Sequence, residues 1–335
     1  MLMVDDAMDT IDQEYAFSQA SNAFGPTEFA NALSQNLNAL GNNIQKLLGR
    51  HGLLKRYQRI AQEKYLFMKI NLMFRAEQFP KEGITSEWWT LESRLWDLTQ
   101  RLYEYRCSHR QENSTSTSLS ETEIVLDWLT DTAPRITETE YIQSNRWFVT
   151  RENIKMRKVT RQNTYNDPIV SELDPDAPLR QAKGLMPEDE ENERKLLKQV
   201  FAYLRIGDIK GAQQVCRDSN NHWRAASLSG ATQGKENMNN HWRRMCFQLA
   251  RQPQVNRYER AVYGVVCGDL DSVLPVCQTW EDQLWAHFNA IYKWRLEENL
   301  RREGGQSDIV VGNFEGVTAD VILERLMNSD NEKIR

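Results

Sequence analysis

The chain has 335 residues, of which 40% are hydrophobic and 27% charged, and its formal net charge is −5. A single hydrophobic core stops growing at about 250–300 residues, so this length predicts two packed modules or one elongated stack of helices. The slightly acidic balance argues against a dedicated nucleic-acid surface, which needs a concentrated basic field. Glycine and proline are both sparse, at 16 and 9 residues, and this favours long helices over a sheet protein with its many turns.

The cysteines and the apolar runs indicate the cellular compartment of the protein. Five cysteines are present and no two form a C-x-x-C pair, so the sequence predicts neither a zinc site nor a disulfide framework. The acidic residues 1–10 lack the apolar segment of a signal peptide. No apolar run approaches the ~18–20 residues that cross a bilayer. We therefore expect a soluble intracellular protein whose free thiols are buried.

Helical periodicity dominates the first part of the chain. Residues 1–24 precede any clear helix and are expected to be disordered. A helix is predicted to open at Pro26, because proline suits the first helical turn. Helical pattern then runs to about Phe79, with a break near Gly49–Gly52. A second helix is predicted from Thr85 to Ser108. Its expected apolar stripe consists of Leu91, Leu95, Leu98, Leu102 and Tyr105.

Polar and proline-rich stretches interrupt the helical pattern in the middle of the chain. The tract 113–118 is predicted to be a surface loop. Ser120 and Glu123 have capping-box spacing and predict the start of a short helix after it. Residues 160–187 carry four prolines and are interpreted as an extended connector. Acidic residues 188–191 then open a new helix, whose positive N-terminal end they suit.

Two segments of the second half repeat one another. Gly207-Asp208-Ile209 and Gly268-Asp269-Leu270 are each followed, at the same offsets, by two small or branched residues and a cysteine. Glycine can cap a helix in the left-handed conformation, and aspartate can cap the next helix. A helix–turn–helix unit used twice indicates a solenoid, in which each pair buries its face on its neighbours. A long helix is predicted from Trp280 to about Glu303, and a last one over 318–327. The fold class is therefore predicted to be an all-α, irregular α-helical solenoid.

A search for catalytic motifs finds none. The sequence contains no G-x-G-x-x-G, no G-x-x-x-x-G-K-[ST], no H-E-x-x-H and no G-x-S-x-G. The five histidines are scattered, without an accompanying cluster of cysteines or carboxylates. We expect no enzyme activity, no cofactor and no metal.

One basic cluster leaves two interpretations open. It consists of Arg151, Lys155, Arg157, Lys158 and Arg161. It could serve nuclear import or nucleic-acid binding, but a solvated helix face is the favoured interpretation. The ten tryptophans fall mostly on helical stripes, which favours core packing over base stacking. No nucleic-acid partner is expected.

The short helix over 221–230 carries the candidate binding site. His222, Ala226 and Ser229 share one face, and Ala225 adds a second small side chain beside it. Small side chains let another helix approach closely. Either a neighbour within the chain or a helix of a partner fills this groove. The candidate partner-binding residues are His222, Trp223, Ala225, Ala226 and Ser229.

Four segments in order resemble the nucleoporin-107/84 family of scaffold nucleoporins. They are 173–180, 223–230, 258–264 and 280–285, and the resemblance runs from about residue 85 to residue 327. The first 80 residues match only in helical character. The resemblance implies a helical stack like the ancestral coatomer element. Its parts would be first trunk helices over 25–119, a crown over 120–303, and a loop with the start of a descending trunk helix over 304–335.

The same resemblance implies a function. Family members are structural subunits of the Y-shaped coat of the nuclear pore complex at the nuclear envelope, with roles in pore assembly, mRNA export and nucleocytoplasmic transport. The crown is expected to dock onto the related nucleoporin 96/145C scaffold, which also carries Sec13. Family chains continue well past residue 335, so the part that binds nucleoporin 133 is expected to be missing here. No direct membrane insertion is implied. The alternative is a vesicle-coat subunit of the Sec31 type, which has the same architecture.

Overall fold

A computed structural model describes most of the chain as two compact units, Met1–Thr117 and Ser118–Arg335. The residues described are 28–34, 52–74, 86–109, 114–136, 146–160, 167–232, 240–302 and 314–327. In these ranges the chain is all α, and an isolated bridge between Ile169 and Gly184 is the one β interaction. The predicted fold class is therefore confirmed. None of the described helices is both long and apolar enough to cross a bilayer. The expected disorder of residues 1–24 concerns a segment outside the described residues.

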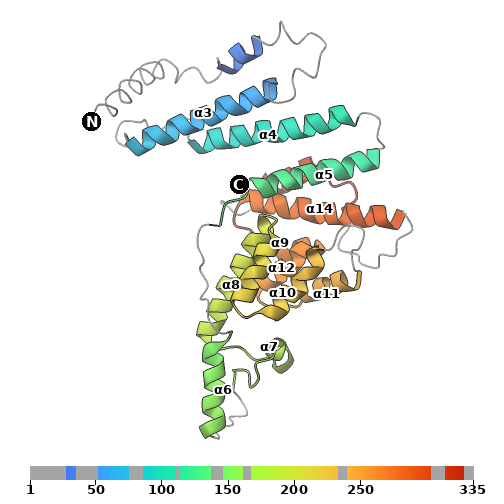
Figure 1. Cartoon of the computed structure of the whole chain (residues 1–335). Helices are drawn as coiled ribbons and strands as arrows, with labels where there is room; N and C mark the ends of the chain where they lie inside the picture. The colour runs from blue at the N-terminus through green and yellow to red at the C-terminus, as the bar shows by residue number, and fades with distance from the viewer. Residues whose placement is uncertain are drawn as a thin grey trace. The chain divides into compact units, whose positions relative to one another are not determined.

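The first unit is built on two long helices that lie side by side, α3 (Leu53–Phe74) and α4 (Ser86–Ser108) (Figure 1). A short helix over 28–34 joins their core. The rings of Tyr57 and Trp96 pack with their centroids 4.7 Å apart, and the ring of Phe29 lies against both. The predicted bounds of the second helix are confirmed by α4. The helix can begin there because Pro80 and Gly83 lie before it and the run that follows contains no helix breaker.

The apolar stripe predicted for α4 is wrong in part. Leu91 and Leu95 are exposed, whereas Trp89 and Ser93 are buried and Trp96 packs in the core with α3. The helix is rotated toward Trp89 and Trp96 because an indole buries more apolar area than a leucine side chain. Leu91 and Leu95 therefore lie on the outer side of α4, whereas Leu98, Leu102 and Tyr105 are half-buried.

Helix α5 (Ser114–Asp131) corrects the loop predicted at 113–118, since the helix already includes Ser114. The tract contains serine and threonine, whose helix propensity is moderate, but no glycine or proline that would stop a helix. Once the apolar C-terminal part of α5 is packed, extending the helix backward adds one hydrogen bond for each residue fixed. The part of α5 from Ser118 belongs to the second unit, where it packs against α14.

The stretch interpreted as an extended connector folds instead into a small element of its own. It contains α7 (Ala177–Gln181), and Val170, Ala177 and Leu185 form a buried cluster with Trp147. Pro178 occupies the first turn of α7, where its missing N–H costs no hydrogen bond. The prolines therefore start a helix here and do not prevent one.

The remaining helices form the second unit, whose centre is α12 (Figure 1). Their bounds are α6 Phe148–Thr160, α8 Pro187–Arg205, α9 Ile209–Asp218, α10 His222–Leu228, α11 Asn240–Ala250, α12 Arg257–Cys267, α13 Leu270–Val273, α14 Trp280–Arg302 and α15 Ala319–Met327. Helix α12 packs against α8, α11, α13 and α14, so its residues from 261 to 267 are buried on every side. The predicted helices at 188, 280 and 318 are confirmed.

Both repeated glycine turns are confirmed, but only one aspartate caps a helix. Gly207 and Gly268 have φ values of 74° and 87°, in the left-handed region that glycine adopts without a steric penalty. The Asp208 carboxylate accepts a hydrogen bond of 2.8 Å from the backbone N–H of Gly211, as predicted. Asp269 makes no such cap; its buried carboxylate accepts from Arg251 at 2.8 Å.

Candidate partner-binding site

Helix α10 presents one open face in the second unit. Its other face is buried through Arg224, Ala225 and Leu228. His222 and Ala226 are exposed, and so is Ser229 at the start of the 3-10 turn that continues α10. These three side chains therefore lie on the exposed side of α10. That a partner binds there stays a prediction.

The other two candidate residues lie elsewhere. Ala225 is only 5% exposed and faces the interior, because it is one position from Ala226 and therefore about 100° away around the helix. The sequence predicts that Ala225 offers a small side chain to an approaching helix. Because Ala225 is buried, this prediction is wrong. Trp223 is half-buried at the edge of the open face, and the Arg224 guanidinium lies 4.6 Å from its ring centroid.

A buried ionic network fixes the inner face of α10. The Arg224 guanidinium lies 3.3 Å from a carboxylate oxygen of Glu193 on α8 and 3.0 Å from one of Glu259 on α12. Burial alone would lower the pKa of Arg224, but the two carboxylates outweigh it and raise the pKa above its usual value. The Ser227 hydroxyl and the Tyr263 hydroxyl add a 2.7 Å hydrogen bond from α10 to α12. The open face is therefore preformed, which lowers the entropy cost of binding.

The C-terminal end of α10 is fixed by Trp242 of α11. The Trp242 indole N–H donates a 2.7 Å hydrogen bond to the backbone carbonyl of Ser227. A Cβ added at Gly230 would overlap the same indole ring, so only glycine lets the turn approach it this closely. The sequence does not indicate this contact between Gly230 and Trp242. The pairing of a glycine with a distant tryptophan leaves no local signal.

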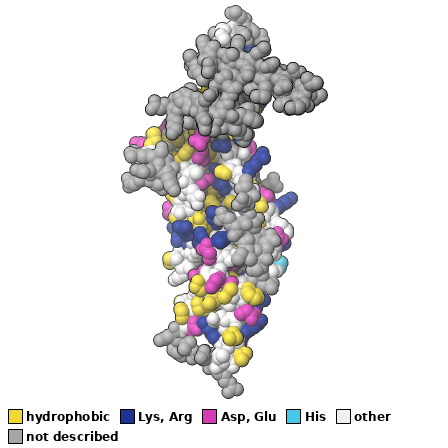
Figure 2. Space-filling model, turned by 90° about the vertical axis from the view of Figure 1, so that its left-hand side faces the viewer, with side chains coloured by type: hydrophobic (Ala, Val, Ile, Leu, Met, Phe, Trp, Pro, Cys, Tyr) yellow, Lys and Arg dark blue, Asp and Glu magenta, His cyan; other side chains and the backbone are white. Residues whose placement is uncertain are grey.

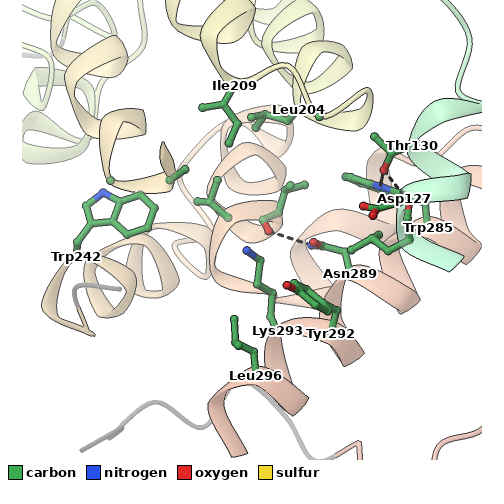
Figure 3. Close-up of a pocket in the computed structure, with 16 residues that line it drawn as sticks. Asp127, Thr130, Leu204, Ile209, Trp242, Trp285, Asn289, Tyr292, Lys293 and Leu296 are labelled. Carbon is green, nitrogen blue, oxygen red and sulfur yellow. Dashed lines mark hydrogen bonds between the residues drawn. The ribbon is translucent and has the colours of Figure 1, made fainter. Parts of the chain in front are cut away.

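A mainly apolar cavity of about 390 Å³ opens beside this turn. Figure 3 shows Trp242 on one side of the cavity and Tyr292, Lys293 and Leu296 of α14 on another. Two hydrogen bonds brace its walls, one from Trp285 to Thr130 at 3.3 Å and one from Asn289 to the backbone carbonyl of Val265 at 2.9 Å. Asp127 and Lys293 are the two charged residues that line it. The cavity lacks the converging ionisable groups of a catalytic site.

The buried cysteines of the second unit are not reactive thiols. Within the described ranges, no group of three or more histidine, cysteine, aspartate or glutamate side chains is arranged to hold a metal ion. Burial raises the pKa of the Cys216 thiol to about 11 and that of Cys246 to about 12. These thiols are therefore protonated near neutral pH and are poor nucleophiles.

Comparison with known proteins identifies relatives of the chain. It matches the family described as Nuclear pore protein 84 / 107 over residues 86–335. It is 31% identical to Nucleoporin nup107 of Schizosaccharomyces pombe, over 97% of this chain and 44% of that protein. It is 32% identical to the human Nuclear pore complex protein Nup107, over 64% of this chain and 26% of that protein. It is 28% identical to Nucleoporin NUP84 of Chaetomium thermophilum, over 64% and 29% of the two chains. The chain thus spans less than half the length of these relatives.

Proposed function

Because the chain belongs to the nuclear pore protein 84 / 107 family, we propose that it is a structural, non-enzymatic scaffold subunit of the Y-shaped coat of the nuclear pore complex. Its relatives are nuclear pore complex components at the nuclear envelope. In this proposal the first unit supplies the first trunk helices and residues 120–303 form the crown. Residues 304–335 begin the descending trunk.

The observation that carries a binding role is the open face of α10. His222, Ala226 and Ser229 are exposed on a helix whose opposite face is fixed by a buried arginine. Exposed small side chains on a rigid helix let a second helix pack at close range. The occupant we propose is a helix of the sister scaffold, nucleoporin 96/145C, with Sec13 in the same complex. Half-buried Trp223 would flank that contact.

The test is a single charge on the open face. Ala226→Asp would bury an unpaired carboxylate against the partner, which costs several kcal/mol unless it finds a partner charge. It should abolish co-elution of the chain with nucleoporin 96/145C in size-exclusion chromatography. The thermal melt by circular dichroism should stay nearly unchanged, because Ala226 is exposed. A matched control is Ala319→Asp, which places the same charge on the exposed Ala319 of α15. If the Ala226→Asp variant still co-elutes, α10 is not the interface.

The broader roles follow from the same proposal. Pore assembly, mRNA export and nucleocytoplasmic transport would depend on the scaffold as a whole. We assign the contact with nucleoporin 133 to a part of the longer relatives that this chain does not match. The proposal requires no membrane insertion. The vesicle-coat alternative of the Sec31 type is set aside because the matched relatives carry nuclear pore names. Imaging tests this choice: a tagged protein should mark the nuclear rim, and punctate cytoplasmic vesicles would reverse it.

A further inference from the structure

Helix α6 carries an apolar stripe that the proposed scaffold contact does not use. Phe148, Met156 and Val159 are 51%, 65% and 80% exposed. The spacings of eight and three residues place all three on one side of the helix. Three large apolar side chains aligned on one exposed helix face are unusual, since scattered single ones are the norm.

A row of cations borders this stripe. Arg151, Lys155 and Lys158 follow one another at helical spacings of four and three. Lys155 lies 2.8 Å from Glu152, but both side chains are largely exposed, so this ion pair contributes little. Within the described ranges, neither Arg151 nor Lys158 has an ion-pair partner. The basic cluster noted in the sequence is therefore one border of an amphipathic face.

The inner face of α6 is firmly held. Thr150 is fully buried; its backbone N–H donates to the Asp189 carboxylate at 2.6 Å, and its hydroxyl accepts from the Met186 N–H at 3.0 Å. Ile154 is buried below it, and Arg157 forms an ion pair with Asp167. The outer face is thus presented by a rigid helix.

The surroundings leave the outer face accessible. Among the described helices, α6 packs mainly against α8, and Figure 1 shows it extending beyond the stack of α9 to α14. In Figure 2 hydrophobic side chains lie among those of basic and acidic residues on this part of the unit. The α6 face is separate from the open face of α10.

We propose that the outer face of α6 docks an amphipathic helix of another protein, with acidic residues along one border. The apolar stripe supplies the buried area of a helix-on-helix contact, and the cation row sets the sign of the partner's charge. A nucleic acid would leave the apolar stripe unused, since its affinity comes from phosphate contacts. An anionic membrane favours a broad apolar face, whereas here Glu152 interrupts the stripe between Phe148 and Met156.

The probe is a displayed library of helical peptides randomised on one face and its borders. Peptides retained by the whole chain are eluted and rebound to three variants. These are Val159→Asp and Lys158→Glu on α6, and Met245→Asp, a matched control at an exposed methionine of α11. One class of peptides should bind the chain and the control alike but lose about tenfold in affinity for both α6 variants, about 1.4 kcal/mol. That class should carry aspartate or glutamate beside a stripe of leucine, methionine or phenylalanine.

Several results would overturn the proposal. One is that no peptide loses affinity for the two α6 variants. Another is that the peptides that do lose affinity carry no excess of aspartate or glutamate. A third is that duplex RNA, or vesicles of phosphatidylserine in phosphatidylcholine, bind the chain but not the Lys158→Glu variant, while the peptides bind both. Ala226→Asp should leave peptide binding unchanged, so the outcome is independent of the proposed α10 contact. Thermal melts of the two α6 variants should match that of the parent, because both positions are exposed.

Discussion

Arg243 of α11 and Glu297 of α14 form an ion pair in the interior of the second unit, with side chains only 1% and 2% exposed. Arg243 also donates a hydrogen bond of 3.3 Å to the backbone carbonyl of Cys267, at the end of α12. One guanidinium therefore links three helices. Burial raises the pKa of Glu297, and the nearby Arg243 opposes this shift. Removing two charged side chains from water has a considerable cost in free energy, which their mutual attraction must offset.

Removing one member of this pair should destabilise the unit far more than removing both. Arg243→Met leaves the Glu297 carboxylate buried without its partner, and we expect a loss of about 3–5 kcal/mol in the free energy of unfolding. The double variant Arg243→Met/Glu297→Leu should recover much of that loss. Urea denaturation followed by circular dichroism measures both. A double variant as unstable as the single one would show that the hydrogen bond to Cys267 matters more than the charges.

His287 on α14 should make stability fall as the pH becomes acidic. Burial lowers the pKa of His287, even though its ring nitrogen lies 2.8 Å from the backbone carbonyl of Gln283. The unfolded chain takes up a proton near pH 6.5 while the folded chain does not, so stability present above that pH is lost as the pH falls below it. Between about pH 7.5 and about pH 5.5, His287→Leu should show a smaller decrease in unfolding free energy than the parent. Equal slopes for the two proteins would contradict this assignment.

Ala225 and Ala226 offer a matched pair of substitutions. Ala225→Asp places a carboxylate in the interior beside the Arg224 network, and we expect a loss of more than about 3 kcal/mol in stability. Ala226→Asp, one residue along, should change stability by less than about 0.5 kcal/mol because it is exposed. Thermal melts compare the two directly. Similar melting temperatures would mean that α10 is oriented differently in solution.

Gly230→Ala should disturb the turn after α10. The new Cβ overlaps the Trp242 indole, and overpacking of this kind costs about 1–3 kcal/mol. In a double-mutant cycle, Trp242→Leu should reduce the cost of the alanine, because the smaller side chain leaves room for it. Additive losses, measured by urea denaturation, would show that the two sites are not coupled.

The sequence predicts elements well where periodicity and helix breakers agree. The start of α4 follows from the helix breakers before it, and α14 follows from a continuous apolar pattern. The turns at Gly207 and Gly268 follow from the need for positive φ. It predicts less well where two residue types compete, as when tryptophans outweigh leucines in orienting α4. The serines of 113–118 predict a loop and the prolines of 160–187 predict a connector, but α5 begins at Ser114 and α7 lies within the second stretch.

The candidate site was only partly predictable for a different reason. The shared face of His222, Ala226 and Ser229 is a property of one helix and follows from spacing alone. The burial of Arg224 between Glu193 and Glu259 joins three helices that are distant in the chain. No local pattern encodes such a contact, so only the folded structure reveals why the inner face of α10 is fixed.

The central position of α12 has a consequence for how the second unit opens. Every neighbour of this helix must separate before its amide groups meet water, so its hydrogen exchange should require unfolding of the whole unit. The amides of α12 are therefore expected to exchange most slowly, with a free energy of opening equal to that of global unfolding. In a structural scaffold, such cooperativity means that mechanical strain is borne by all of these helices together.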